Sequence, residues 1–381
     1  MNQMDWPPPG PPGPPPVPVP PPMPVAFTGK RRDFFELVRR GAGLELVTLG
    51  FYRFWLLTDI RRHLWSNTLV DGDAAEYTGR GRELLIGFLI AMAILMPIYL
   101  GYFLVGIEAE RWQALASFPL IAAFYVFGQF AIYRARRYRL TRTVWRGVRF
   151  WMTGSGWAYA ARATLWGLLA IVTLGIAMPW REAALERYKM RHSWYGDLQG
   201  KFEGRGWEFF KGIWWLWLLT PIALFVFPLL PFLYAHYKAV EWRWWLSGIR
   251  IGGVRVESTL EPSALQGLYW KVVGWSMLLS TALGIFVTVA VMLLLKVSEA
   301  ESADALMQSP AMIAVLVVGY LTFALGLGVV VRLYLSRDLW VKVMASTKLY
   351  GLESAANVAA RGDLASALGE GFADGLDVGG F

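Results

Sequence analysis

The sequence predicts an α-helical protein that crosses a membrane about four to six times. Internal repeats, re-entrant or interfacial segments and small cytoplasmic β-hairpins complete the expected fold class. Three observations support this fold class. Hydrophobic residues make up 56% of the 381 residues and charged residues only 17%, whereas soluble domains are about 25% charged. The apolar residues gather in long runs, basic stretches separate these runs, and part of the chain repeats itself.

Six runs reach the ~20 mostly apolar residues that a membrane-spanning helix needs. They are residues 84–106, 114–133, 157–179, 212–234, 272–295 and 311–335. The first two share a short connector and are predicted to form a hairpin, as are the last two. Three prolines interrupt 212–234, so a bent or broken helix is expected there. Residues 44–57 are too short and too charged to cross and are predicted to be interfacial or re-entrant.

The two ends of the chain differ from this membrane domain, which is expected to cover residues 26–350. Residues 1–25 are proline-rich, and such a segment is predicted to be a disordered, semi-extended tail. A plain spacer is favoured for it, with a protein partner as the alternative. Residues 351–381 end in an acidic, glycine-rich stretch and are predicted to be a flexible cytoplasmic tail.

The distribution of basic residues predicts the orientation. Residues 134–156 contain seven arginines and no acidic residue, and such loops stay on the cytoplasmic side. The same rule places both termini in the cytoplasm. One stretch conflicts with simple crossing, because 180–211 is also basic. It would face outward if 157–179 and 212–234 each crossed once, so a return of both runs without crossing is favoured.

An internal repeat relates residues 28–87 to residues 153–212 at a shift of 125 positions. The identities cluster in T-L-G and in G-R-G-x-E, and they include the pairs Trp55/Trp180, Arg80/Arg205 and Glu83/Glu208. A recurring aromatic-x-Gly or Met-x-Gly triplet precedes the apolar stretches. It predicts a short strand that ends near a glycine and leads into a helix. Basic aromatic stretches that turn at a glycine and then alternate apolar with polar residues predict strand pairs that associate with one another.

These motifs resemble the YjgN-like family of bacterial inner-membrane proteins. The resemblance rests on TLGFYRFW (48–55), N-T-L-x-x-G (67–72), Y-x-G-R-x-x-E-L (77–84), TLGIAMPW (173–180), R-I-G-G-V-R-V-E-S-T-L (250–260) and the glycine-rich end (369–381). It covers nearly everything after the proline tail. It implies location and architecture but no established activity, because the family is one of unknown function. No functional residue is carried over from it.

The sequence offers little catalytic chemistry. It has no cysteine and three histidines, His63, His192 and His236, none with a second ligand at metal spacing. No nucleotide, zinc or serine-nucleophile motif is present. A non-enzymatic protein without cofactor or metal is therefore expected. The basic, Trp-rich stretches are typical of interfacial aromatic belts and predict contact with anionic lipid headgroups rather than nucleic acid.

Seven residues are the candidates for a functional or turn-holding role. Arg162 lies six residues into an apolar run, where snorkelling to the headgroups is favoured over a substrate or ion site. Glu83 and Glu208 either complement the positive end of a helix or pair with Arg80 and Arg205 to hold the turn. Trp55 and Trp180 occupy matched positions of the repeat.

Two functions remain open at this point. The favoured hypothesis is a transporter or channel-like pathway for a small or lipidic solute, since repeats and broken helices often build transport sites near the midplane. The alternative is a non-catalytic membrane scaffold that binds anionic lipid and protein partners.

Overall fold

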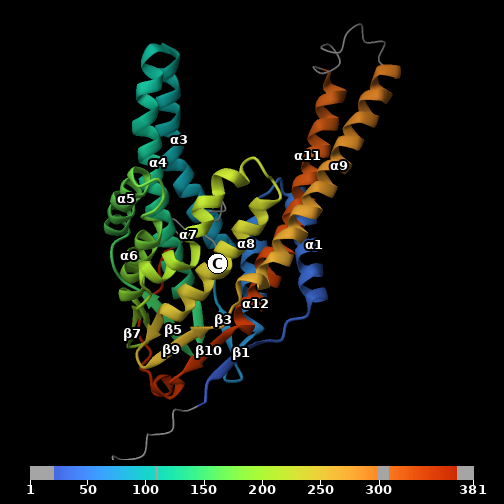
Figure 1. Cartoon of the computed structure of the whole chain (residues 1–381). Coiled ribbons are helices and arrows are strands. Elements are labelled where there is room, and N and C mark those ends of the chain that lie inside the picture. The colour runs from blue at the N-terminus through green and yellow to red at the C-terminus, as the bar shows by residue number, and fades with distance from the viewer. Residues whose placement is uncertain (1–20, 109, 298–308, 367–381) are drawn as a thin grey trace, which may run out of the picture.

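A closed ring of short strands carries five helical hairpins on one side (Figure 1). This computed structural model describes residues 21–108, 110–297 and 309–366. Residues 1–20 of the predicted proline tail and residues 367–381 of the predicted C-terminal tail lie outside these residues. The small β-hairpins that the sequence predicts to associate do so, and they join into one closed ten-stranded barrel, which the sequence analysis did not predict.

Ten antiparallel strands form the barrel. They are β1 (Met23–Phe27), β2 (Thr68–Val70), β3 (Asp73–Tyr77), β4 (Thr143–Trp145), β5 (Val148–Met152), β6 (Ser193–Tyr195), β7 (Leu198–Phe202), β8 (Ile249–Ile251), β9 (Val254–Ser258) and β10 (Thr347–Tyr350). Each strand from β2 to β9 pairs with its sequence neighbours. The first and last strands pair with each other, with Met23 opposite Leu349, and this contact closes the ring.

Tight turns fix the register of the four sequential hairpins. Two residues connect the paired positions in each, as in Val70 opposite Asp73 and Trp145 opposite Val148. Such turns need positive φ angles, which Asp71 (φ 53) and Gly72 (φ 81) adopt in the first hairpin. The glycines that mark the end of each basic aromatic stretch in the sequence are therefore turn residues of the barrel.

Two helices rise from the barrel between consecutive strand pairs. The first helical hairpin is α1 (Arg31–Val47) with α2 (Arg53–Ser66), the second α3 (Gly81–Glu108) with α4 (Glu110–Thr141), the third α5 (Gly156–Val172) with α6 (Met178–Arg191), and the fourth α7 (Gly206–Ala223) with α8 (Leu229–Gly248). The fifth pairs α9 (Gln266–Val297), which follows the short η1 (Pro262–Leu265), with α11 (Pro310–Val331), the π-helical segment η2 (Arg332–Asp338) and α12 (Leu339–Ala345).

Within the described residues, the second and fifth helical hairpins differ from the other three in length and apolarity together. Among the described residues, four helical stretches are long and apolar enough to cross a membrane, and all four belong to these two hairpins. They identify the chain as a helical membrane protein. The α5 helix has 17 residues, or about 25 Å at 1.5 Å per residue, which is shorter than the ~30 Å apolar core of a bilayer. Figure 1 shows the other three hairpins ending well below the tips of the long ones.

The sequence predicts four to six crossings, and the described residues contain four candidate spans. The runs 157–179 and 212–234 do not supply two more spanning helices, because each run contains a chain reversal, after α5 ends at Val172 and after α7 ends at Ala223. The run 212–234 is broken between Ala223 and Leu229, as its prolines predict. Residues 180–211 therefore lie at the same end of the molecule as 134–156, and the conflict in the charge pattern disappears.

The tips of the three short helical hairpins expose large apolar side chains. Val47 and Val172, which end α1 and α5, are 79% and 80% exposed, and Phe225 between α7 and α8 is 91% exposed. In the first tip Thr48 donates to the Leu44 carbonyl (2.7 Å) and accepts from the Tyr52 amide (2.9 Å). Thr173 makes the same two contacts in the third tip. The T-L-G motif is therefore the sequence of a capped helix reversal.

Side chains fill the barrel. Trp145, Tyr195 and Val254 come from three different strands and form one buried cluster with Leu352 and Ala355 of the short helix η3 (Leu352–Ala355). Partly buried residues of six further strands and of the segment after η3 pack against it: Met23, Val70, Val148, Phe150, Leu198, Ile251, Leu349 and Val358. The ring is thus a packed core rather than an open channel in the residues that the structure describes.

Substitution of Gly206 tests how closely the ring holds the helical hairpins. A Cβ atom there would lie 2.8 Å from the Trp180 Cα, and Gly81 faces Trp55 in the same way. We expect Gly206→Ala to lower the free energy of unfolding by about 1–3 kcal/mol, measured by thermal unfolding of the full chain in detergent. Gly43→Ala is the matched control, since its Cβ would meet nothing within 4 Å. An equal effect of both variants would contradict the close contact.

Candidate functional site

The matched tryptophans of the sequence repeat hold the starts of the next helices. Trp55 packs on the Gly81 that begins α3, and Trp180 packs on the Gly206 that begins α7. The Trp180 ring also lies 5.3 Å from the ring of Phe210. The last glycine of each G-R-G motif is therefore required by a close backbone approach and is not part of a phosphate loop.

The two matched glutamates have different partners. Glu83 makes an ion pair with Arg142 (2.8 Å) and accepts a hydrogen bond from the Tyr138 hydroxyl (2.7 Å). Glu208 instead accepts a hydrogen bond from the backbone amide of Arg205 (3.4 Å) and caps α7. In the described part of the chain, neither carboxylate pairs with the side chain of Arg80 or Arg205. Both glutamates lie in the first turn of their helices.

Arg162 lies on the exposed surface of α5. Its guanidinium donates to the Ala158 carbonyl (2.9 Å) and lies 4.6 Å from the centre of the Tyr188 ring. It lines neither of the two cavities described below. The structure therefore places Arg162 at a helix surface and not in the interior between the third and fourth helical hairpins.

A buried ionic cluster joins the second and third helical hairpins. Arg136 of α4 contacts Glu186 of α6 at 2.8 Å, and Lys189 contacts the same carboxylate. Only 17%, 8% and 11% of these three side chains is exposed. The Arg136 guanidinium also lies 5.7 Å from the centre of the Trp245 ring, which brings in α8 of the fourth hairpin. The sequence analysis did not single out this cluster.

Two carboxylates one turn apart on α6 have pKa values shifted in opposite directions. Burial by itself raises the pKa of Glu186, but Arg136, Lys189 and hydrogen bonds from Lys189 and Trp245 lower it to about 2. Burial raises the pKa of Glu182, an effect that the neighbouring Arg181 only partly offsets. Glu186 therefore stays charged wherever the protein is folded near neutral pH, and its role is to hold two cations.

A second ion pair ties the fifth helical hairpin to the first. Arg332 donates to both carboxylate oxygens of Glu45, at 2.8 and 2.7 Å. Arg31 pairs with Asp338 at 3.1 Å at the other end of η2. A π-helical turn is uncommon and often marks a functional position, and here it lies between the two pairs. The sequence could not reveal the first pair, because its partners are 287 residues apart.

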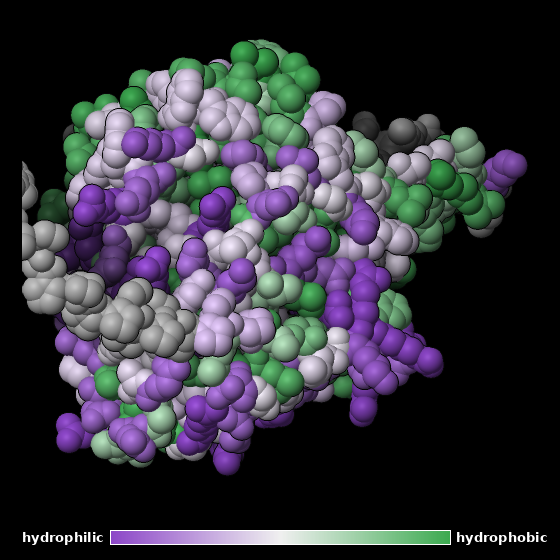
Figure 2. All heavy atoms as spheres, turned by 60° about the horizontal axis from the view of Figure 1, so that its bottom comes forward, coloured by the Kyte–Doolittle hydropathy of each residue, from purple (hydrophilic) through white to green (hydrophobic). Residues whose placement is uncertain are grey.

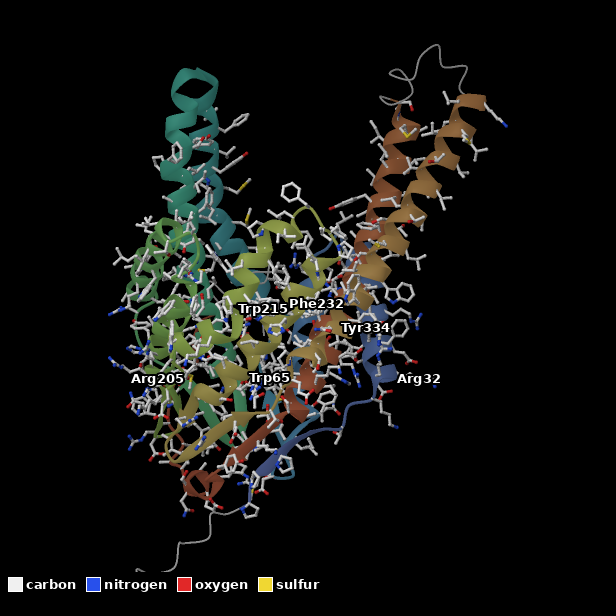
Figure 3. The ribbon with its side chains drawn as sticks, viewed as in Figure 1. Arg32, Trp65, Arg205, Trp215, Phe232 and Tyr334 are labelled. Carbon is white, nitrogen blue, oxygen red and sulfur yellow. The ribbon has the colours of Figure 1, made fainter. Side chains whose placement is uncertain are left out.

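A cavity of about 1150 Å³ lies where β7 passes into α7 and where α8 runs back to the barrel. We call it the basic cavity. It is lined by Lys201, Phe202, Glu203, Gly204, Arg205, Glu208, Gly212, His236, Val240, Arg243, Trp244, Ser247, Gly248, Arg250 and Pro262. Figure 3 shows Arg205 near the barrel, at the level of Trp65 and Arg32, with Trp215 and Phe232 further up the bundle.

A smaller cavity of about 420 Å³ lies under the C-terminal segment, next to Trp151, Asp197 and Arg361. This segment follows the outside of the barrel as far as residue 366. The Ala359 amide donates to the Asp197 carboxylate (3.2 Å), and the Ala365 amide donates to the Thr141 hydroxyl (3.3 Å). The first part of the region predicted as a C-terminal tail is therefore packed on the barrel.

Figure 2 looks toward the barrel end and shows hydrophilic side chains gathered there, with apolar surface on the helices beyond. No group of three or more His, Asp or Glu residues arranged to hold a metal ion occurs within the described ranges. The interactions described at these sites are ion pairs and hydrogen bonds.

Comparison with known families agrees with this architecture. Residues 22–230 match the family described as bacterial protein of unknown function (DUF898). The chain belongs to this family. It is the same family as the YjgN-like proteins that the motifs resemble. No curated protein and no solved structure matched the chain.

In this DUF898 protein the matched region ends just after the start of α8. It contains the first three helical hairpins, α7 and strands β1 to β7. Strands β8 to β10, the fifth helical hairpin and most of the α8 face of the basic cavity lie beyond it. The parts that close the barrel are therefore outside the region that defines the family.

Replacement of Glu186 tests the buried cluster. Glu186→Gln leaves Arg136 and Lys189 without a counter-charge, so we expect a loss of about 3–5 kcal/mol in the free energy of unfolding. The lowered pKa adds stability above the ordinary carboxyl pKa near 4.5, and this stability is lost as the pH falls toward 2. Denaturation of the wild-type and variant chains at several pH values between about 3 and 7 measures the lost free energy of unfolding and its dependence on pH.

The control is Glu36→Gln, because Glu36 and its partner Arg32 are exposed on α1 and such pairs contribute little. If Glu186→Gln kept the wild-type stability and the wild-type acid sensitivity, the cluster would not hold the two helical hairpins together.

Proposed function

We propose that this protein is a non-catalytic scaffold of the bacterial inner membrane that inserts three short helical hairpins into one leaflet and binds anionic lipid there. Two spanning hairpins anchor it across the bilayer. One observation carries the proposal: the tips of the first, third and fourth hairpins expose apolar side chains yet end far below the tips of the second and fifth.

The exposed tips favour lipid over water. Each square ångström of apolar surface removed from water contributes roughly 25 cal/mol, and the tip residues Val47, Val172 and Phe225 are each at least 79% exposed. All three tips point to the same side as the spanning helices. Five hairpins would thus occupy the leaflet next to the barrel, whereas only two would occupy the opposite leaflet.

Charge supports a cytoplasmic barrel. Arginines 134, 136, 137, 139 and 142 lie at the barrel end of α4, and Arg187, Lys189 and Arg191 lie at the barrel end of α6. Basic residues near membrane helices favour the cytoplasmic side and attract anionic lipid by about 1 kcal/mol each. The described ends of the chain also lie at the barrel, because β1 pairs with β10.

The packing of the barrel favours a scaffold function rather than a transport function. Aromatic and aliphatic side chains fill the described lumen, and Arg162, the residue singled out for a solute site, lies on an exposed helix face. The proline-rich tail stays predicted to be a spacer, with recruitment of a protein partner as the alternative.

Depth measurements at single cysteines test the proposal, because the native chain has none. We expect bimane labels on Val47→Cys, Val172→Cys and Phe225→Cys to be quenched most by nitroxides placed deep in the acyl chains of reconstituted vesicles. None of the three should react with a membrane-impermeant maleimide from either side.

Arg255→Cys, on an exposed position of β9, is the control and should react from the barrel side only. Reaction of a tip cysteine from the side opposite to Arg255→Cys would mean that the short helical hairpins cross the membrane, and the proposal would fail.

A further inference from the structure

The basic cavity holds two arginines that no carboxylate neutralises. Lys201 and Arg250 both contact Glu203, at 2.9 and 3.1 Å, and this contact lowers the pKa of Glu203. Glu208 is engaged by the backbone amide of Arg205. In the described ranges, the side chains of Arg205 and Arg243 make no ion pair, although both line the same cavity.

The surroundings of these arginines are ordered by aromatic packing. Trp244 donates its indole N–H to the Arg205 carbonyl (3.1 Å). Its ring stacks on Phe209 at 4.7 Å and meets the edge of Phe202 at 5.1 Å. The backbone that carries Arg205 is therefore fixed from two directions, by Trp244 and by Glu208. A site arranged before its ligand arrives loses less entropy on binding.

The cavity lies at the level where the bundle enters lipid. Trp207, near the start of α7 and two residues after Arg205, is 53% exposed, and exposed tryptophans are typical of the membrane–water interface. Arg205 directly precedes α7, and Arg243 lies on the part of α8 that returns to the barrel. Both guanidiniums are therefore placed at headgroup depth.

We infer that the basic cavity binds the phosphate group of an anionic ligand, with Arg205 and Arg243 as the recognising side chains. Guanidinium groups suit this role because their planar donors match phosphate oxygens in pairs and keep their charge at all relevant pH values. At this depth the phosphate comes either from a phospholipid headgroup or from a soluble phosphate compound. The site deepens the proposed scaffold function and rests on it for its depth in the membrane, but its binding can be measured in detergent.

Titration of the full chain in a neutral detergent tests the site. The probes are dioctanoyl phosphatidylglycerol and, separately, inorganic phosphate, with binding followed by isothermal titration calorimetry. We expect wild-type protein to bind the lipid and the double variant Arg205→Gln/Arg243→Gln to bind it at least about tenfold more weakly, since each charged hydrogen bond contributes roughly 1.5–3 kcal/mol.

Arg80→Gln is the matched control, because Arg80 precedes α3 as Arg205 precedes α7 but does not line the basic cavity. It should bind as the wild type does. Unchanged melting temperatures will show that the variants fold, which is expected because Arg205 and Arg243 are both exposed.

The two probes separate the two sources. Tight binding of the lipid with weak binding of inorganic phosphate assigns the site to a headgroup, and the reverse assigns it to a soluble phosphate. Lipid binding that survives the double variant, or that Arg80→Gln weakens equally, would overturn the inference. Neither result depends on how deep the short helical hairpins insert, so a failure here leaves the scaffold proposal standing.

Discussion

Closure of the strand ring between β1 and β10 is the constraint on which the rest of the molecule depends. Strands of three to five residues are too short to be stable as separate hairpins, and closure leaves no unpaired edge. Because every helical hairpin begins and ends at this ring, each must return to the side from which it rose. The ring thus places both ends of every helical hairpin on one side, and the length and apolarity of the helices then distinguish the four candidate spans from the shorter hairpins.

Buried charge then joins the helical hairpins above the ring. Arg136 with Glu186 links the second to the third, and Arg332 with Glu45 links the fifth to the first. Such pairs contribute little net stability compared with apolar packing, but breaking one is costly. These ion pairs therefore help to specify which helical hairpins pack side by side.

Much of the local structure could be predicted from the sequence. The prolines of 212–234 predict the break between α7 and α8, and glycines near the ends of basic stretches predict strand turns. A further local signal marks the change from helix to strand, because a Thr or Ser begins several strands. Its hydroxyl donates a hydrogen bond to the carbonyl four residues earlier, as at Thr68, Thr143, Ser193 and Thr347. These hydroxyls cap the last helical turn, so they mark where helix gives way to strand.

By itself, the sequence determined the elements of this protein: a membrane chain of the DUF898 family, its apolar helical runs, strand turns at glycine and a basic end. These follow from neighbours within a few residues, which hydropathy and turn chemistry report directly. Only the tertiary structure decided the closed barrel and the basic cavity. Each depends on segments far apart in the chain, such as Met23 beside Leu349 and Arg205 beside α8, and a single sequence carries no local signal for such pairings.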